Sequence, residues 1–189
     1  MELEAEAVEI LHYGSHTVSG LLQTEAYARA RMRAADPQAP DETIDARVTA
    51  RLSRQLRLSE ANPPRMTVIL DEAVLRRRVG GPAVMRAQLA ALLKVLGVGR
   101  VLIQILPFEL GEYGFSGGAQ TLLVLADGTR IAYVEGDGVG TVLEEPGIVT
   151  ARWHKYDRLR SLALPPRESE ALIRSAMEDH ARCSPQSST

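Results

Sequence analysis

Two short apolar segments separated by helical sequence place the strongest constraint on the fold. Residues 66–70 (MTVIL) and 100–106 (RVLIQIL) are rich in β-branched side chains and are bounded by Pro or Gly residues, which is typical of buried strands. Between them, Asp71 can cap a short helix, and Pro82 begins a longer helix that ends at Gly97. A strand, two helices and a second strand predict a parallel pair joined by a right-handed crossover.

Turn signals predict a hairpin after this unit. Residues 119–125 and 130–135 are apolar and flank Ala126-Asp127-Gly128-Thr129, a strong hairpin signal. One more strand is expected at residues 140–145. Further helices are predicted over residues 1–12, 24–34, 44–56 and 146–159 and after Pro165-Pro166. The sequence therefore predicts an α/β or α+β fold, with a mixed sheet of about five strands packed with about six helices.

Length, charge and cysteine content exclude several classes of protein. The chain has 189 residues, 22 Lys and Arg against 24 Asp and Glu, and a net charge of −2, so it lacks the basic footprint of a free-standing nucleic-acid-binding protein. No apolar run approaches the roughly 20 residues that cross a bilayer. The acidic start has no signal-peptide core, and the lone Cys183 forms no internal disulfide. We expect one cytoplasmic domain over residues 1–182, a disordered tail at residues 183–189, and no direct contact with nucleic acid or membrane.

Two carboxylates follow the first of these strands. Asp71 and Glu72 leave the strand and enter a helix, at the place where open α/β sheets often carry ligand-binding groups. Paired carboxylates can perform acid–base chemistry when burial separates their pKa values. An Asp at the N-cap followed by a Glu in the first turn is also ordinary helix capping, and we favour capping.

Glu135 is the other candidate acid. Alternation along residues 131–135 places it on one face of a strand with Ile131 and Tyr133. If that face is interior, Glu135 needs a cationic partner, because an unpaired buried carboxylate is costly. Arg54 or Arg76 can supply that partner. Three interpretations stay open: a polar anchor in a ligand pocket, a structural buried ion pair, or a charge on an edge strand. The other residues expected to line such a pocket are Tyr133, Gln104 and Phe108.

The segment LLQT at residues 21–24 has a functional and a structural interpretation. Gln23 and the two leucines can form the wall of a pocket or an interface, whereas the threonine can cap the next helix. We favour capping and packing, which need no ligand. His12 and His16 are four residues apart, but Gly14 interrupts the helix that would bring them together, so no metal site is expected.

Two glycine-rich stretches match no phosphate-binding loop. Residues 111–118 (GEYGFSGG) and 136–140 (GDGVG) lack the Lys-Ser/Thr of such a loop and are expected to be mobile loops or lids. The basic run at residues 76–78 is expected to be a solvated helix end rather than a nucleic-acid patch. No cofactor is expected.

Five strings together resemble a known family of domains. In sequence order they are SGLLQTEAYARA (19–30), RLSRQ (51–55), LDEAVLRRRVGGPAVMRAQL (70–89), QILPFELGEYG (104–114) and AYVEG (132–136). Their order and spacing are similar to the C-terminal domain of actinobacterial XRE-type helix-turn-helix transcription regulators. That domain has unknown function, is common in streptomycetes and is sometimes labelled antitoxin-like. Its usual Pro-Gly-Leu-Leu-Gln-Thr run has Ser19 in place of the proline in this chain.

The resemblance implies the sensing or partner-binding half of a transcription regulator. In that family a DNA-binding helix-turn-helix domain precedes this region, whereas Met1 stands almost at the start of the domain here. The expectation is either a trimmed chain or a free-standing domain without direct DNA contact. We expect a non-enzymatic regulatory domain that binds a small molecule or a small partner protein and can form a homodimer through its helices. The alternative is a biosynthetic enzyme, for instance a cyclase, that uses Glu135 and Asp71. The residues expected to bind a ligand are Gln23, Arg54, Asp71, Arg76, Gln104, Phe108, Tyr133 and Glu135.

Overall fold

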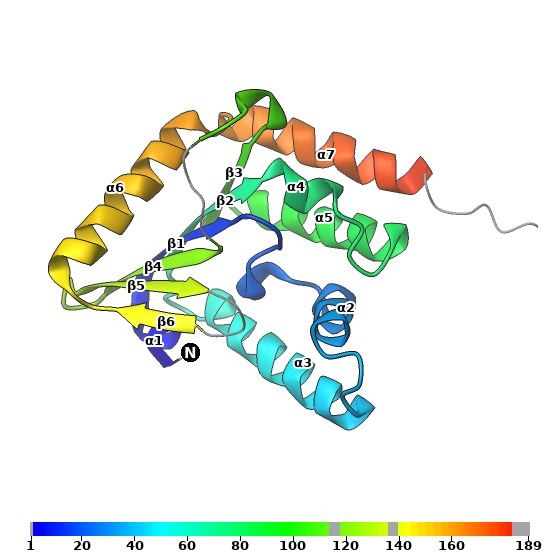
Figure 1. Cartoon of the computed structure of the whole chain (residues 1–189), viewed down its shortest axis with the longest axis horizontal. Coiled ribbons are helices and arrows are strands. Elements are labelled where there is room, and N and C mark those ends of the chain that lie inside the picture. Colours follow the sequence, from blue (N-terminus) through cyan, green and yellow to red (C-terminus); the bar gives the residue numbers. More distant parts are fainter. Residues whose placement is uncertain (1, 114–117, 136–139, 183–189) are drawn as a thin grey trace, which may run out of the picture.

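The computed structural model describes residues 2–113, 118–135 and 140–182. Within these residues, six strands form one mixed sheet in the order β3-β2-β1-β4-β5-β6 (Figure 1). β1, β2 and β3 are parallel to one another, whereas β4 is antiparallel to β1 and the strands after it alternate in direction. The strands are β1 (Ala7–Gly14), β2 (Arg65–Asp71), β3 (Val101–Leu106), β4 (Gln120–Leu125), β5 (Arg130–Glu135) and β6 (Gly140–Leu143). This mixed α/β architecture confirms the predicted fold class.

Helices cover both faces of the sheet. Helix α6 lies across one face, whereas α4, α5 and α7 lie on the other, where the α2–α3 hairpin projects outward (Figure 1). The α-helices in the described part of the chain are α1 (Glu2–Glu6), α2 (Glu25–Ala35), α3 (Asp41–Gln55), α4 (Glu72–Arg76), α5 (Pro82–Leu96), α6 (Pro146–Leu162) and α7 (Pro166–Arg182). Three short 3₁₀ helices are η1 (Gly20–Leu22), η2 (Leu56–Ser59) and η3 (Phe108–Leu110). None of the helices within these residues is long and apolar enough to cross a membrane.

The helix predicted over residues 1–12 is correct only for its first half, α1, because the second half belongs to the central strand β1. β1 forms hydrogen bonds with β2 on one side and β4 on the other. Ile10 contributes to the core on one face, whereas Leu11 and Tyr13 contribute to the core on the opposite face. A strand buried on both faces carries an apolar run without alternation, and the spacing of Ala7, Ile10 and Leu11 also fits a helical stripe. The sheet therefore has six strands where the sequence predicted about five, and β1 is the additional strand.

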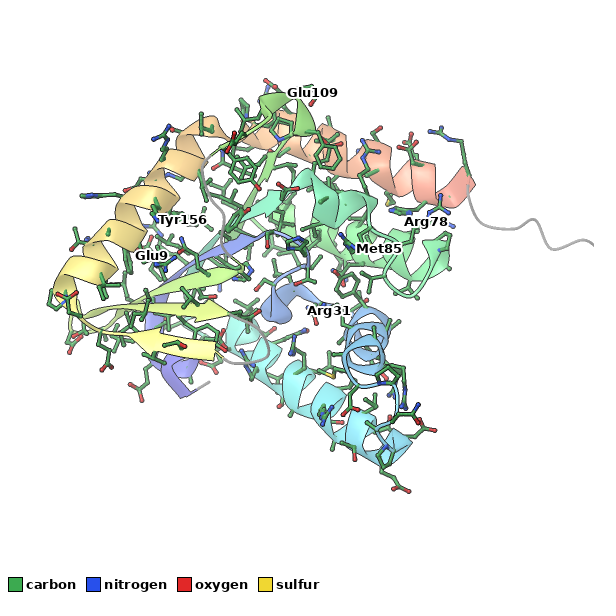
Figure 2. All side chains as sticks on the ribbon, in the orientation of Figure 1. Glu9, Arg31, Arg78, Met85, Glu109 and Tyr156 are labelled. Atoms are coloured by element: carbon green, nitrogen blue, oxygen red, sulfur yellow. The ribbon has the colours of Figure 1, made fainter. Side chains whose placement is uncertain are left out.

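Each face of the sheet has its own hydrophobic core. The larger core lies under α4, α5 and α7 and includes Met85, which is fully buried. The smaller core lies under α6 and includes Tyr156, whose hydroxyl donates to the Thr67 carbonyl at 3.0 Å. Figure 2 shows Met85 and Tyr156 on the two sides of the sheet. Side chains of successive strand residues therefore enter different cores, which decides the face on which each candidate site residue lies.

Most other elements agree with the sequence predictions. β2 and β3 form the predicted parallel pair, and β4 and β5 form the predicted hairpin. Thr24 caps α2 by accepting from the Tyr27 amide at 3.4 Å, and Asp71 caps α4 by accepting from the Ala73 amide at 2.7 Å. The predicted tail at residues 183–189 and the centres of both glycine-rich loops lie outside the described residues.

Candidate functional site

The carboxyl ends of the three parallel strands lie at one edge of the sheet. β1, β2 and β3 end there at Gly14, Asp71 and Leu106, and β4 begins there at Gln120. From β1 the chain proceeds to β2 and β3 on one side, whereas the later strands are added on the other side. Such a reversal of strand order is a topological switch point, where open α/β sheets commonly bind ligands. The polar groups at this edge are therefore the first candidates for a site.

A chain of hydrogen bonds joins two phenols to a carboxylate at this edge. The Tyr113 hydroxyl donates to Asp71 Oδ2 at 2.5 Å and lies 2.8 Å from the Tyr13 hydroxyl. A phenol has one proton, and Tyr113 gives its proton to the carboxylate, so Tyr13 donates to Tyr113. The two rings meet edge to face, with centroids 6.5 Å apart. Asp71 thus serves both as the cap of α4 and as the end of this chain.

Burial keeps both phenols protonated. Burial, followed by the hydrogen bond to Asp71, raises the pKa of Tyr113 far above its ordinary value. Burial also raises the pKa of Tyr13. At neutral pH the two hydroxyls are therefore hydrogen-bond donors and not bases. This arrangement favours binding and positioning over proton abstraction.

Gln120 lies beside this chain of hydrogen bonds but takes no part in it. It faces Tyr13 directly across the antiparallel β1–β4 pair, so the two side chains lie on the same face of the sheet. Only 1% of Gln120 is exposed, and neither Nε2 nor Oε1 has a hydrogen-bond partner among the described residues. The buried side-chain polar atoms without a partner in that part of the chain both belong to this residue. A buried amide left without partners costs about 1–3 kcal/mol, so it marks a place where a further polar group fits.

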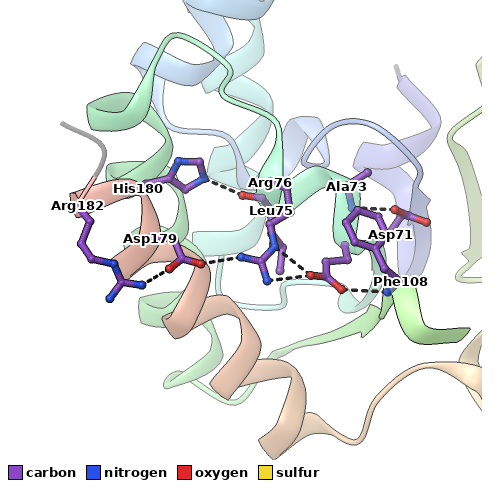
Figure 3. Close-up of polar contacts among 9 residues, drawn as sticks. Asp71, Ala73, Leu75, Arg76, Phe108, Asp179, His180 and Arg182 are labelled. Atoms are coloured by element: carbon purple, nitrogen blue, oxygen red, sulfur yellow. Dashed lines mark hydrogen bonds and ion pairs between the residues drawn. The ribbon is translucent and has the colours of Figure 1, made fainter. Parts of the chain in front are cut away.

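Glu72 connects the candidate edge to the helices behind it. Its Oε2 accepts from the Phe108 amide at 2.9 Å, and its Oε1 accepts from Arg76 Nε at 2.9 Å (Figure 3). Arg76 in turn donates to Asp179 on α7 at 2.7 Å, and Asp179 also pairs with Arg182. Glu72 is buried, so both of its oxygens are satisfied within the fold. Arg76 was predicted to bind a ligand. In the structure its guanidinium links α4 to α7 by ion pairs with Glu72 and Asp179.

His12 lies on the opposite face of β1 from Tyr13. Its Nδ1 is 3.0 Å from the Thr121 hydroxyl, and the side chain is buried. Burial lowers the pKa of His12 to about 4, so the ring is neutral at pH 7. His12 therefore lies on the face of β1 that carries the larger core, away from the chain of hydrogen bonds at Asp71.

Hydrogen bonds from three glutamine side chains, one of them within the segment, fix the LLQT segment in place. Gln23 donates to the Val18 carbonyl at 2.7 Å and accepts from Arg51 at 3.2 Å. Gln88 donates to the Leu22 carbonyl at 2.8 Å, and Gln55 donates to the Gln23 carbonyl at 2.8 Å. Because these contacts satisfy the segment internally, the packing interpretation of Gln23 agrees with the structure better than a role in a ligand pocket.

Glu135 and Tyr133 lie near the arginines of α3. Glu135 is exposed at the end of β5, so it needs no buried cationic partner and the interior interpretation is wrong. Arg54 pairs with Glu4. Burial lowers the pKa of Arg51, and the negative charge of Glu135 partly opposes that shift. The predicted proximity of an α3 arginine to β5 is present, but it forms a surface cluster and not a buried ion pair.

The expected pocket of Gln104, Phe108, Tyr133 and Glu135 does not form. β3 and β5 are separated by three intervening strands, which corresponds to roughly 19 Å between strand axes at about 4.8 Å per step. The Gln104 side chain donates to the Leu164 carbonyl at 3.0 Å, and Phe108 is 56% exposed in η3. Asp71 and Glu135 likewise lie on different strands and opposite faces of the sheet, so they cannot act as an acid–base pair.

Comparison with known families identifies the chain. A family model described as "Domain of unknown function (DUF5753)" matches residues 1–175. The chain belongs to the DUF5753 family. No curated protein and no solved structure matches this DUF5753 domain. Within its described residues, no group of three or more His, Cys, Asp or Glu side chains is arranged to hold a metal ion.

Three residues of the candidate site in this DUF5753 domain were missed from the sequence. Tyr13 directly follows the segment predicted as helix, and Tyr113 lies in a glycine-rich stretch predicted as a mobile loop. Gln120 begins the run QTLLVL, and a glutamine at the start of an otherwise apolar strand was a signal that could have been used. None of the three forms a recognisable motif, because the sheet brings them together from distant parts of the chain.

Proposed function

We propose that this DUF5753 domain is a cytoplasmic regulatory module that binds a small molecule at the carboxyl edge of its parallel strands. It resembles the C-terminal domain of XRE-type helix-turn-helix regulators, and a sensing role fits that resemblance. The single observation that carries the proposal is the buried amide of Gln120, which has no partner among the described residues and lies beside the Tyr13–Tyr113–Asp71 chain of hydrogen bonds. A protein that leaves such an amide unsatisfied loses stability unless a ligand completes it.

The surroundings of Gln120 indicate the chemistry of that ligand. An amide side chain offers one acceptor oxygen and two N–H donors. On the same face, the core under α6 supplies nearby apolar side chains such as Leu11 and Leu122. A largely apolar molecule with an amide, carbonyl or hydroxyl group would satisfy Gln120 and bury its remaining surface. Both phenol protons are donated within the Tyr13–Tyr113–Asp71 chain of hydrogen bonds, so the phenols offer a ligand acceptor oxygens rather than protons.

Native mass spectrometry tests this proposal. The wild-type chain, incubated with fractionated small-molecule extract and transferred gently, is expected to retain one organic molecule per chain. The same molecule should raise the unfolding midpoint, because a ligand that binds only the folded state stabilises it. The Gln120→Leu variant should retain none. Equal retention by wild type and variant, or no retained molecule from any fraction, would contradict the proposal.

A further inference from the structure

A groove lies at the opposite edge of the sheet from Asp71. It has a volume of about 780 Å³ and lies where β2 and β3 begin, next to the first turn of α7. Arg65 begins β2, Arg100 precedes β3, and Arg167 stands in the first turn of α7. Because β2 and β3 are parallel, their first residues share one edge, and this groove is separate from the site at Gln120.

Three arginines in this groove have no side-chain partner within the part of the chain that the structure describes. Arg65, Arg100 and Arg167 are exposed, and none makes an ion pair or side-chain hydrogen bond with a described residue. Elsewhere on the surface many arginines are paired, for example Arg29 with Asp45 and Arg174 with Glu170. A guanidinium presents a planar set of donors that matches a carboxylate in two parallel hydrogen bonds. Three such groups around one groove favour a ligand with several carboxylates.

Two carboxylates of the chain lie in the same groove. Glu9 of β1 and Glu170 of α7 both line it, and Glu170 accepts from Arg174 at 2.9 Å. A dense polyanion such as polyphosphate or nucleic acid would be repelled by these two residues. A peptide can place carboxylates against the arginines and a basic side chain against Glu9. The mixed charge therefore favours a protein segment.

The shape of the surface also fits an extended segment. A second hollow of about 400 Å³ follows α7 and shares Arg167 and Glu170 with the first. Prolines and apolar side chains form part of the wall of the first groove, including Pro64, Met66 and Leu96. Such walls allow apolar contacts between the charged positions, as in other peptide-binding grooves.

We propose that this groove binds an acidic, extended segment of a partner protein. The partner is recognised by carboxylates that pair with Arg65, Arg100 and Arg167, and by a nearby cation that pairs with Glu9. The inference goes beyond the small-molecule site and does not rest on it, since the two lie at opposite edges of the sheet. A Gln120→Leu substitution should leave peptide binding unchanged.

Selection from a phage-displayed library of random peptides tests the inference. Peptides selected on the full chain are expected to be enriched in Asp and Glu, and synthetic copies labelled with fluorescein give their affinities by anisotropy. The Arg65→Ala/Arg167→Ala variant should weaken binding by at least about tenfold, and added salt should also weaken it. The matched Arg86→Ala/Arg158→Ala variant removes two exposed arginines outside the groove and should change affinity by less than about twofold.

Three results would overturn the inference. They are the absence of any selected peptide, selected peptides without acidic enrichment, and equal loss of binding in the groove variant and the control variant. Tripolyphosphate and a short DNA duplex provide a further arm. If either competes for the arginines more strongly than the best acidic peptide, the groove is a polyanion site and the peptide assignment is wrong. Circular dichroism of each variant shows whether its fold is intact.

Discussion

Gln120 and Tyr13 lie directly opposite each other on antiparallel strands, at the edge where the parallel strands end. The Tyr13 hydroxyl is 2.8 Å from that of Tyr113, whereas the buried Gln120 side chain has no hydrogen-bond partner in the described residues. A satisfied polar chain and an unsatisfied amide are therefore neighbours. The first joins Tyr113 to the ends of β1 and β2, and the second is the group that we propose a ligand completes.

Removing the Tyr113 hydroxyl is expected to destabilise the fold. In Tyr113→Phe, Asp71 loses a buried donor and Tyr13 loses its acceptor, so the free energy of unfolding should fall by about 1–3 kcal/mol. Urea denaturation measures the change. Tyr133→Phe is the matched control, because no hydrogen bond of its hydroxyl with a described residue is present, and it should change stability by less than about 0.5 kcal/mol. Equal losses of unfolding free energy in both variants would show that the hydrogen bonds from Tyr13 through Tyr113 to Asp71 do not stabilise the fold.

Stability is expected to fall as the pH drops from about 6.5 to about 4. The unfolded chain protonates His12 near pH 6.5, whereas burial lowers the pKa in the folded chain to about 4. Between these values the unfolded state binds more protons, so the free energy of unfolding decreases with falling pH, by on the order of 3 kcal/mol for a group of this kind. His12→Gln should reduce that slope. Denaturation curves at several pH values measure it, and an unchanged slope in the variant would contradict the assignment.

Gly14 is expected to tolerate no side chain. A Cβ at this position would lie 2.6 Å from the Thr17 carbonyl oxygen and 3.1 Å from Leu70 Cδ2. Gly14→Ala should therefore destabilise the protein by about 1–3 kcal/mol. At Gly97 the nearest atom would be 3.4 Å away and φ is −63°, so Gly97→Ala should be neutral or stabilise by up to about 1 kcal/mol. Thermal unfolding of the two variants compares them, and a stable Gly14→Ala would show that the β1 end has room to adjust.

The two acids considered from the sequence are expected to behave differently. Asp71→Asn removes the charge that accepts from Tyr113 and from the α4 amide, and should cost about 1–3 kcal/mol and weaken ligand retention. Glu135→Gln changes an exposed side chain and should leave both stability and retention unchanged. Parallel urea titrations and native mass spectra of both variants measure these effects. Loss of ligand in Glu135→Gln with retention in Asp71→Asn would move the site to the β5–α3 surface.

The sequence predicted most elements because their signals are local. The β2–β3 crossover, the β4–β5 hairpin and the Thr24 cap follow from periodicity, turn residues and capping chemistry within short windows. β1 was missed because a strand buried on both faces lacks alternation and can match a helical stripe. Its burial depends on β2 and β4, which are distant in the sequence.

The candidate site was only partly predictable for a related reason. Asp71 follows a strand end, so its position at the edge could be inferred from the order of elements. The assignment of Gln104 and Tyr133 to one pocket failed because strand order decides the distance across a sheet. The sequence does not reveal that three strands lie between β3, which carries Gln104, and β5, which carries Tyr133. Gln120 became a candidate only once its burial and missing partners were visible.

The most direct test of the central claim is the unfolding midpoint of Gln120→Leu without ligand. Leucine has a similar size and no polar atoms, so it removes the unsatisfied amide from an apolar face. We expect a rise in stability of about 1–3 kcal/mol, at roughly 2–4 °C per kcal/mol for a chain of this size, together with loss of the bound molecule. A lower midpoint would mean that the amide is already satisfied in the folded protein, and the proposed ligand site at Gln120 would be wrong.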